Sequence, residues 1–222
     1  MIIGIDGPAG AGKSTIAKLI AKELGFSCLD TGAMYRSIAW KALQEGVALD
    51  DVDALGKIAV ENEIEFTFDD DADRAQHVFI GGQEVTTVIR TPEVDKAVSP
   101  VSAAPSVREA LLVQQRRIGS KGNYVVEGRD ICTTVFPNAE VKVFLTASAE
   151  ERARRRMAQN EARGMTDETF EEILADIIRR DEADSTRAVS PLRQAEDATL
   201  VDSSDMTIEE VVKTICDLAR QA

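Results

Sequence analysis

The chain has 222 residues, enough for one domain with a sizeable hydrophobic core. Hydrophobic residues make up 44% and charged residues 29%, a balance typical of folded soluble chains rather than disordered ones. A net charge of −13 disfavours nonspecific nucleic-acid binding and attraction to anionic membranes. The sequence shows no signal-peptide pattern and no apolar run near the ~20 residues of a membrane span. Because its three cysteines lie far apart, we expect a cytoplasmic protein without disulfides or a zinc site.

The N-terminal part alternates between strand and helix signals. Residues 2–6 (IIGID) predict a buried strand, and a glycine-rich turn leads into a helix over residues 13–24 that ends at Gly25. Residues 26–29 (FSCL) predict a second strand, and DTG separates it from a helix over residues 33–46. This alternation predicts βαβ units and a parallel sheet.

Residues 63–89 have a different pattern. Apolar and polar residues alternate over residues 63–68, which predicts a strand with one exposed face. The sequence around Gly81-Gly82 predicts a hairpin, so we expect a small antiparallel insert. The acidic run at residues 69–73 is interpreted as an exposed turn, because it lacks the glycine of a calcium loop. His77 is interpreted as structural, since no second ligand or triad partner accompanies it.

The later elements return to the first pattern. Helices are predicted near Pro92 and over residues 105–120, and strands over residues 124–127 and 141–145. Two long helices, an edge strand at residues 199–201 and a terminal helix complete the chain.

Residues 7–14 (GPAGAGKS) match the phosphate-binding motif G-x-x-x-x-G-K-[ST] between a strand and a helix. Glycines let backbone N–H groups surround phosphate oxygens, and the helix N-terminus adds partial positive charge. Lys13 is expected to reach the β- and γ-phosphates, and the Ser14 hydroxyl to bind Mg²⁺. The predicted ATP-binding residues are Gly7, Pro8, Ala9, Gly10, Ala11, Gly12, Lys13, Ser14 and Thr15.

Three classes of nucleotide-dependent protein contain such a loop: switch GTPases, regulatory or mechanical ATPases, and small-molecule kinases. The sequence has no N-K-x-D guanine motif, and 222 residues leave little room for the sensor apparatus of a regulatory ATPase. A kinase needs a second anion site for the acceptor and must exclude water when closed.

Arginines concentrate where such a site is needed, since residues 143–212 contain nine arginines and no lysine. A helix is predicted from near Asp167, with an apolar stripe made of Phe170, Ile173, Leu174, Ile177 and Ile178. Steps of three and four residues extend the row of Ile173 and Ile177 to Arg180, Asp184 and Arg187, whereas Arg179 points the opposite way. We expect Asp184 to orient Arg180 and Arg187. The two interpretations are an oxyanion site and a buried structural ion-pair network.

Other arginines occupy positions suited to the same task. Arg152, Arg155 and Arg156 follow helical spacing, which fits either a lid that closes over phosphates or a solvated helix. Arg36 in DTGAMYR and the pair Arg129–Asp130 in EGRD each follow a predicted strand. Because ligands bind at the carboxyl ends of parallel strands, both segments are expected to open onto the crevice that holds the phosphate-binding loop.

The chain resembles the bacterial cytidylate kinases, a family of nucleoside monophosphate kinases. The matching stretches are IDGPAGAGKST, LDTGAMYR, EVDKAVSPVSAAPSVREALL, EGRD with VFPNAEVKVFL, SAEERARRRM and RRDEADSTRAVSPL. The resemblance implies an α/β P-loop kinase fold with a parallel sheet flanked by helices, a small antiparallel β insert and an Arg-rich helical lid. It implies one kinase domain with three regions: a core (about 1–35, 100–150 and 188–222), a monophosphate-binding region (about 36–99) and a lid (about 151–187).

The resemblance also implies a reaction and its residues. The γ-phosphoryl group of ATP would pass to CMP or dCMP with Mg²⁺ present, and we expect a monomer. The implied catalytic residues are Lys13, Arg155, Arg156, Arg180 and Arg187. The implied CMP-binding residues fall into groups by the part of the ligand they contact. Arg36, Arg129 and Arg187 are implied for the phosphate, and Arg180 and Asp184 lie near the ribose and the transferring phosphate. Ser99, Arg108 and Asp130 are implied for cytosine, and Thr31 for the CMP site in general.

Some questions stay open at this point. Cys132 and Thr134 depart from the family pattern after GRD, which affects base selection more than the reaction. Asp6 and Asp130 are candidates for ordering the waters of a bound metal. The alternatives are a related kinase with another acceptor, such as UMP or shikimate, and a nucleotide-dependent binding protein without turnover.

Overall fold

A computed structural model describes residues 1–69, 76–162, 164 and 168–222. The chain divides into two compact units, the first comprising Met1–Cys28 and Gly122–Ala222 and the second Leu29–Lys121. These bounds differ from the functional division into core, monophosphate-binding region and lid, which stays a prediction. Most of the acidic run (residues 70–73), part of the lid and the expected helix start near Asp167 lie outside the described residues.

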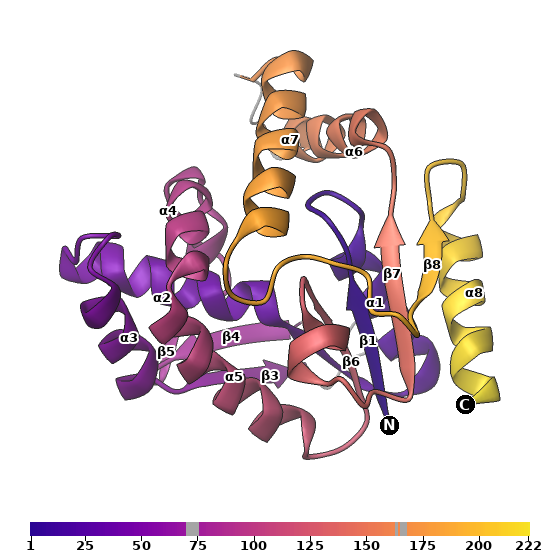
Figure 1. The fold of residues 1–222 in the computed structure, drawn as a ribbon, viewed down its shortest axis with the longest axis horizontal. Helices are drawn as coiled ribbons and strands as arrows, with labels where there is room; N and C mark the ends of the chain where they lie inside the picture. The colour runs from indigo at the N-terminus through magenta and orange to yellow at the C-terminus, as the bar shows by residue number, and fades with distance from the viewer. Residues whose placement is uncertain (70–75, 163, 165–167) are drawn as a thin grey trace. The chain divides into compact units, whose positions relative to one another are not determined.

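The first unit is built on a parallel sheet, as predicted. Its strand order is β2-β6-β1-β7-β8, and the paired strands β1 with β6, β1 with β7 and β7 with β8 are parallel (Figure 1). The strands are β1 (Ile2–Asp6), β2 (Ser27–Asp30), β6 (Tyr124–Gly128), β7 (Val141–Thr146) and β8 (Thr199–Asp202). Since β1 lies between β6 and β7, Asp6 at its carboxyl end faces Gly128 and Phe144 of the neighbouring strands.

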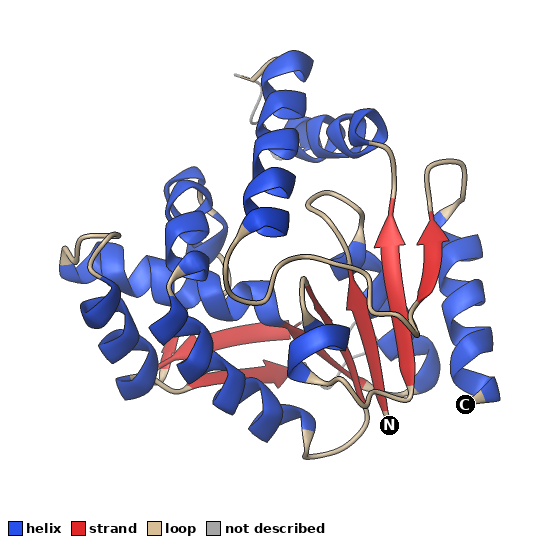
Figure 2. Ribbon diagram, in the orientation of Figure 1, coloured by secondary structure: helices blue, strands red, loops and turns tan. Residues whose placement is uncertain are grey.

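Helices surround this sheet (Figure 2). They are α1 (Lys13–Leu24), α6 (Ala149–Ala162), α7 (Phe170–Thr186) and α8 (Ile208–Gln221). Helix α1 has the predicted bounds, and Gly25 caps it in the left-handed conformation that favours glycine. Apolar residues of α1 and α8, such as Ile20 and Ile215, pack into one core with Ile3, Ile5 and Leu145 of the strands.

Helix α7 carries most of the predicted apolar stripe. Ile173 and Ile177 are buried and pack with Ala153 of α6, and Phe170 and Leu174 are partly buried against the same cluster. The prediction for Ile178 was wrong, because its side chain is 51% exposed. At 100° per residue, Ile178 lies on the edge of the stripe where Leu174, one turn earlier, is itself only partly buried.

The second unit holds the remaining elements. These are α2 (Thr31–Glu45), α3 (Val52–Glu61), β3 (Ile64–Phe68), β4 (Gln76–Ile80), β5 (Gln83–Glu84), the short 3₁₀ helix η1 (Val88–Arg90), α4 (Pro92–Ala103) and α5 (Pro105–Gly119). Strands β3, β4 and β5 form the predicted antiparallel insert. Helix α2 begins at Thr31, earlier than expected, because the Asp30 carboxylate accepts the Ala33 N–H and caps it.

Helix α3 was not predicted, although its sequence carries the signals. The Asp51 side chain accepts the Ala54 N–H, which is a helix N-cap, and Leu55, Ile58 and Ala59 are buried at helical spacing. Ten residues between two stronger patterns are easily taken for a loop.

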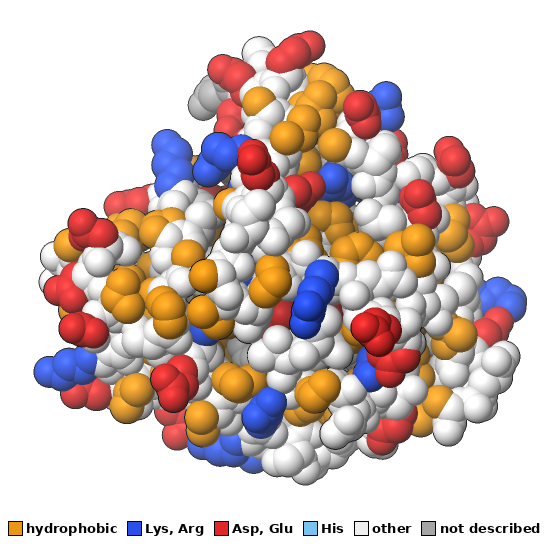
Figure 3. Space-filling model, in the orientation of Figure 1, with side chains coloured by type: hydrophobic (Ala, Val, Ile, Leu, Met, Phe, Trp, Pro, Cys, Tyr) orange, Lys and Arg blue, Asp and Glu red, His pale blue; other side chains and the backbone are white. Residues whose placement is uncertain are grey.

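The surface agrees with the composition. On the face shown in Figure 3, acidic side chains are spread among polar and hydrophobic ones, as the net charge of −13 implies. Among the residues that the structure describes, no helix is both long and apolar enough to cross a membrane.

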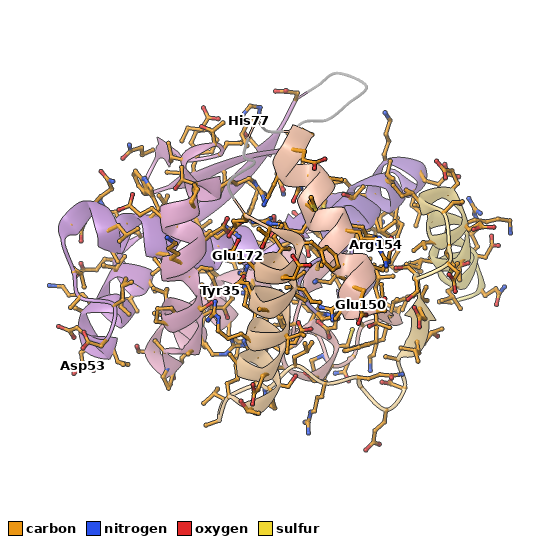
Figure 4. The ribbon with its side chains drawn as sticks, turned by 90° about the horizontal axis from the view of Figure 1, so that it is seen from above. Tyr35, Asp53, His77, Glu150, Arg154 and Glu172 are labelled. Carbon is orange, nitrogen blue, oxygen red and sulfur yellow. The ribbon has the colours of Figure 1, made fainter. Side chains whose placement is uncertain are left out.

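His77 on β4 (labelled in Figure 4) joins two carboxylates of the insert. Its Nδ1 lies 2.8 Å from Glu84 Oε1 and its Nε2 lies 3.1 Å from Asp69 Oδ1. The hydrogen bond with Glu84, followed by that with Asp69, raises the pKa of His77. A raised pKa adds stability at low pH that is lost as the pH rises through the folded-state value.

We therefore expect the melting temperature of the wild-type protein to exceed that of His77→Gln below about pH 6, with the difference shrinking by about pH 8. Thermal unfolding across this pH range measures the effect. A difference that grows with pH would contradict the structural role of His77.

Candidate phosphate- and nucleotide-binding residues

The loop of residues 7–14 connects β1 to α1, and its glycines are required by close approaches. A Cβ on Gly7 would lie 1.9 Å from the Leu145 carbonyl oxygen of β7. Gly10 has φ +76°, and a Cβ there would lie 3.1 Å from Arg152 Cβ. Both positions therefore favour glycine over residues with a side chain. The glycines allow the loop backbone to adopt the conformation in which its N–H groups can surround a phosphate.

Lys13 is buried, and its Nζ donates a hydrogen bond to the Pro8 carbonyl 2.8 Å away. Burial, and then the nearby positive charge of Arg129, lower the pKa of Lys13 from 10.5 to about 7. The carboxylates of Glu127, Asp6 and Asp184 act in the opposite direction. A bound polyphosphate would favour the charged form of this buried lysine, because its negative charge would offset the cost of burial.

Glu127 is a candidate site residue that the sequence analysis missed. It is buried near the end of β6, and its Oε1 accepts a hydrogen bond from the Ser14 hydroxyl. The signal was available, since the acid directly follows the apolar YVV of a strand whose carboxyl end adjoins that of β1. The contact places a carboxylate beside the predicted metal ligand.

Asp6, a candidate for ordering the waters of a bound metal, holds a backbone turn in the structure. Its two carboxylate oxygens accept the backbone N–H groups of Ile131 at 2.7 Å and Cys132 at 2.8 Å. These hydrogen bonds fix the start of a single-turn π-helix, η2 (Ile131–Val135). Burial raises the pKa of the Asp6 carboxyl group. Both oxygens are thus engaged in holding this turn. Cys132 is buried there, and burial raises the pKa of its thiol.

An ion-pair network joins the EGRD segment to α7. Arg129 Nε lies 2.8 Å from Asp184 Oδ2, and Asp184 Oδ1 lies 3.6 Å from Arg187 Nη1. Arg187 Nη2 in turn lies 3.5 Å from Asp130 Oδ1. The network alternates in charge and includes four of the predicted CMP-binding residues.

The facing prediction for α7 is confirmed by burial. The side chains of Arg180 and Arg187 are 21% and 9% exposed, against 66% for Arg179. Asp184 pairs with Arg187, as expected, and also with Arg129, which directly follows β6; its expected pairing with Arg180 stays a prediction. The ion pair of Arg180 is with Asp176, at 3.9 Å.

The two arginines predicted to belong to a lid, Arg155 and Arg156, are held by groups of the protein itself. Arg155 donates to the Ser203 carbonyl at 2.6 Å and to Glu151 Oε1 at 3.0 Å. Arg156 donates to Gln159 at 3.2 Å. Their predicted action on phosphates stays a prediction.

The second unit carries the other predicted CMP-binding residues. Thr31 is the buried first residue of α2, and Arg36 pairs with Asp95 and donates to the Ile89 carbonyl at 3.1 Å. Arg108 is buried, with its guanidinium 5.4 Å from the centre of the Tyr35 ring. Arg108 also donates to the Ser102 carbonyl at 3.2 Å, and the Ser102 hydroxyl donates to the carbonyl of Ser99.

Sequence reasoning also missed Arg90. It donates to Asp30 Oδ2 at 3.0 Å and so ties η1 to the start of α2. The Asp30 carboxylate therefore has two partners: one oxygen accepts the Ala33 N–H at the start of α2, and the other pairs with Arg90. Together these contacts fix the turn that precedes Arg36.

A glycine-rich loop between a parallel strand and a helix, with a buried lysine and a serine beside a carboxylate, defines a P-loop phosphate-binding protein. The fold agrees with a solved shikimate kinase from Bacteroides thetaiotaomicron, which is 16% identical, with a TM-score of 0.50 over 99% of this chain and 98% of that one.

The family model for cytidylate kinase matches residues 3–221. A cytidylate kinase from Geobacillus sp. is 49% identical over 99% of this chain and 96% of its own length. A second, from Carboxydothermus hydrogenoformans, is 48% identical over 98% and 96%. The chain belongs to the cytidylate kinase family, and the predicted activity, ATP-dependent phosphorylation of CMP or dCMP, is confirmed at that level.

Proposed function

We propose that this kinase binds the phosphates of ATP with residues 7–15 and the acceptor monophosphate with arginines that include Arg129 and Arg187. The observation that supports this best is electrostatic. Arg129 and Asp184 both act on the pKa of Lys13, so the ion-pair network lies within electrostatic range of the phosphate-binding loop. Two phosphate groups that must react would then share one charged environment.

Catalysis would be positional and electrostatic, because the monophosphate dianion is already nucleophilic. Lys13 would neutralise the charge of the transferring group, and Arg180 and Arg187 would do the same from α7. Arg155 and Arg156 would assist if they exchange their present partners for phosphate.

Mg²⁺ is proposed as the metal, since the residues present fit it. The Ser14 hydroxyl and the Glu127 carboxylate are hard oxygen donors in contact with each other. Ser14 would bind the ion directly, and Glu127, rather than the engaged Asp6, would order its water ligands. When bound with ATP, the metal would neutralise charge on the β- and γ-phosphates.

Base selection is assigned to Ser99, Arg108 and Asp130. Cytosine offers an N4 amino donor to a hydroxyl or carboxylate, and its N3 and O2 are acceptors for arginine. Uracil inverts the pattern at N3 and position 4, which would leave buried polar groups unpaired. The phosphate is assigned to Arg36, Arg129 and Arg187, and the ribose region to Arg180 and Asp184. Thr31 is assigned to the acceptor site without a specific group.

A substrate panel tests the assignment. ATP consumption is measured with CMP, dCMP, UMP and shikimate as acceptors, and we expect kcat/KM for CMP to exceed that for UMP by at least roughly 100-fold. Comparable rates with UMP would remove the cytosine assignment. Binding of ATP without turnover on any acceptor would favour a binding protein instead.

We also propose that the kinase acts as a monomer in the cytoplasm, with no nucleic-acid or membrane partner. The three cysteines are buried thiols, which suits a reducing compartment. Light scattering at micromolar concentration measures the oligomeric state.

A further inference from the structure

Arg152, at the start of α6, is a buried arginine to which the proposed function gives no task. Its Nε donates to the Ala147 carbonyl at 2.9 Å, and its Nη1 donates to the Ala9 carbonyl at 2.9 Å. Nη1 also lies 2.6 Å from Asp181 Oδ2 of α7. A buried guanidinium with three well-placed partners has one fixed position.

The contact with Ala9 matters because Ala9 belongs to the phosphate-binding loop. When the N–H groups of such a loop turn inward toward an anion, its carbonyls point outward and need donors. The Pro8 carbonyl accepts from Lys13, and the Ala9 carbonyl accepts from Arg152. The closeness of Gly10 to the Arg152 backbone shows that loop and helix are packed together at this point.

Asp181 connects the same arginine to α7. Its carboxylate is 23% exposed, and its Oδ1 is buried with no hydrogen-bond partner within the described part of the chain. Asp181 therefore depends on Arg152 for compensation of its charge. Helix α7 also carries Arg180 and Asp184, and Arg187 directly follows it, so one ion pair links the helix of the proposed acceptor-binding residues to the loop.

We infer that Arg152 is a positioning residue that holds Ala9 and thereby the phosphate-binding shape of the loop. Asp181 fixes Arg152, so the geometry of the loop depends on the position of α7. This inference rests on the proposed binding of ATP phosphates by residues 7–15.

Four variants test it: Arg152→Gln, Asp181→Asn, the double variant, and Arg154→Gln as the matched control. Arg154 lies on the same helix with its side chain 65% exposed (Figure 4). We expect Arg152→Gln to raise the KM and the Kd for ATP roughly 30-fold while the KM for CMP changes less than about threefold. Asp181→Asn should raise the KM and the Kd for ATP by a smaller factor than Arg152→Gln does. The double variant should have the same KM and Kd for ATP as Arg152→Gln, because the two residues act as one unit.

Melting temperatures distinguish positioning from stability alone. A lowered melting temperature with unchanged ATP affinity in Arg152→Gln, or equal ATP effects in Arg154→Gln, would overturn the inference. If the increases in the Kd for ATP are additive in the double variant, Asp181 does not act through Arg152, and that part of the inference is wrong. If Arg152→Gln does not fold, the ATP affinity of Asp181→Asn decides: an unchanged affinity would contradict the inference. A failure of the proposed function is distinguishable from this outcome: in that case, Lys13→Met would bind ATP as tightly as the wild-type protein does.

Discussion

Replacing Lys13 by methionine is expected to lower kcat/KM for ATP by roughly 10³-fold, because the change removes the cation placed to neutralise the transferring phosphoryl group. Methionine keeps the length and most of the volume of the buried stem, so the fold should persist. Steady-state kinetics at saturating CMP measure the loss. Lys18→Met is the matched control, since Lys18 is exposed on the same helix. A loss of less than about threefold in Lys13→Met would contradict the role.

The lowered pKa of Lys13 adds a pH signature to this prediction. The pKa of Lys13 is about 7, well below the ordinary 10.5, so the unfolded chain binds this proton more tightly and stability rises with pH between these values. Bound ATP favours the protonated lysine and therefore raises its pKa. We expect the Kd for ATP to rise above about pH 7, by at most about tenfold per pH unit. The Kd of Lys13→Met should lack this dependence on pH. Calorimetric titration in two buffers measures the proton uptake.

The second large effect is expected on α7. Arg187→Ala should lower kcat/KM for CMP by roughly 10²- to 10³-fold and Arg180→Ala by roughly 10²-fold, because each removes a partly buried cation from the proposed phosphate environment. Arg179→Ala should change it less than about threefold, since Arg179 is exposed and its ion pair with Asp176 is a surface pair. The substitutions at Arg179 and Arg180 are chemically identical and adjacent on α7, so they differ in the face from which each side chain projects.

Melting temperatures decide between the two interpretations of this helix. A structural ion-pair network would make Arg187→Ala less stable but leave kcat/KM intact well below the melting temperature. Equal losses of activity in Arg179→Ala and Arg180→Ala would refute the facing argument. Partial recovery in Arg187→Lys would indicate that charge, and not only the planar fork, is used.

Much of the fold was predictable because its signals are local. The phosphate-binding loop, the strand over residues 2–6 and the hairpin at Gly81-Gly82 each follow from a few adjacent residues. The facing of Arg180 also followed from helical periodicity, since this residue lies on α7 beyond the buried part of the apolar stripe. Arg187 is buried too, but it lies one residue past the end of α7 in an extended conformation, so its position depends on the chain that follows the helix. Ile178 marks the limit of that reasoning, because the width of the covered face depends on α6.

The partners of the site residues were less predictable. Arg129 pairs with Asp184 and Arg152 bonds to Ala9, contacts between residues 55 and 143 positions apart in the sequence. No periodicity relates such positions, so only the folded chain shows that Glu127 lies beside Ser14. Local patterns therefore identified most of the candidate residues, whereas the tertiary structure determined their counterions.

The arginines assigned to the acceptor phosphate are already neutralised by the protein. Arg36 pairs with Asp95, Arg129 with Asp184, and Arg187 with Asp130. Substrate binding at these side chains would therefore be an exchange of one anion for another, and its free energy would be the difference between two ionic contacts. Such exchange disfavours weakly charged ions such as chloride, which cannot replace a carboxylate, and favours a dianion that can. With this arrangement, an acidic protein would bind a dianionic ligand without presenting a bare cationic surface to other polyanions.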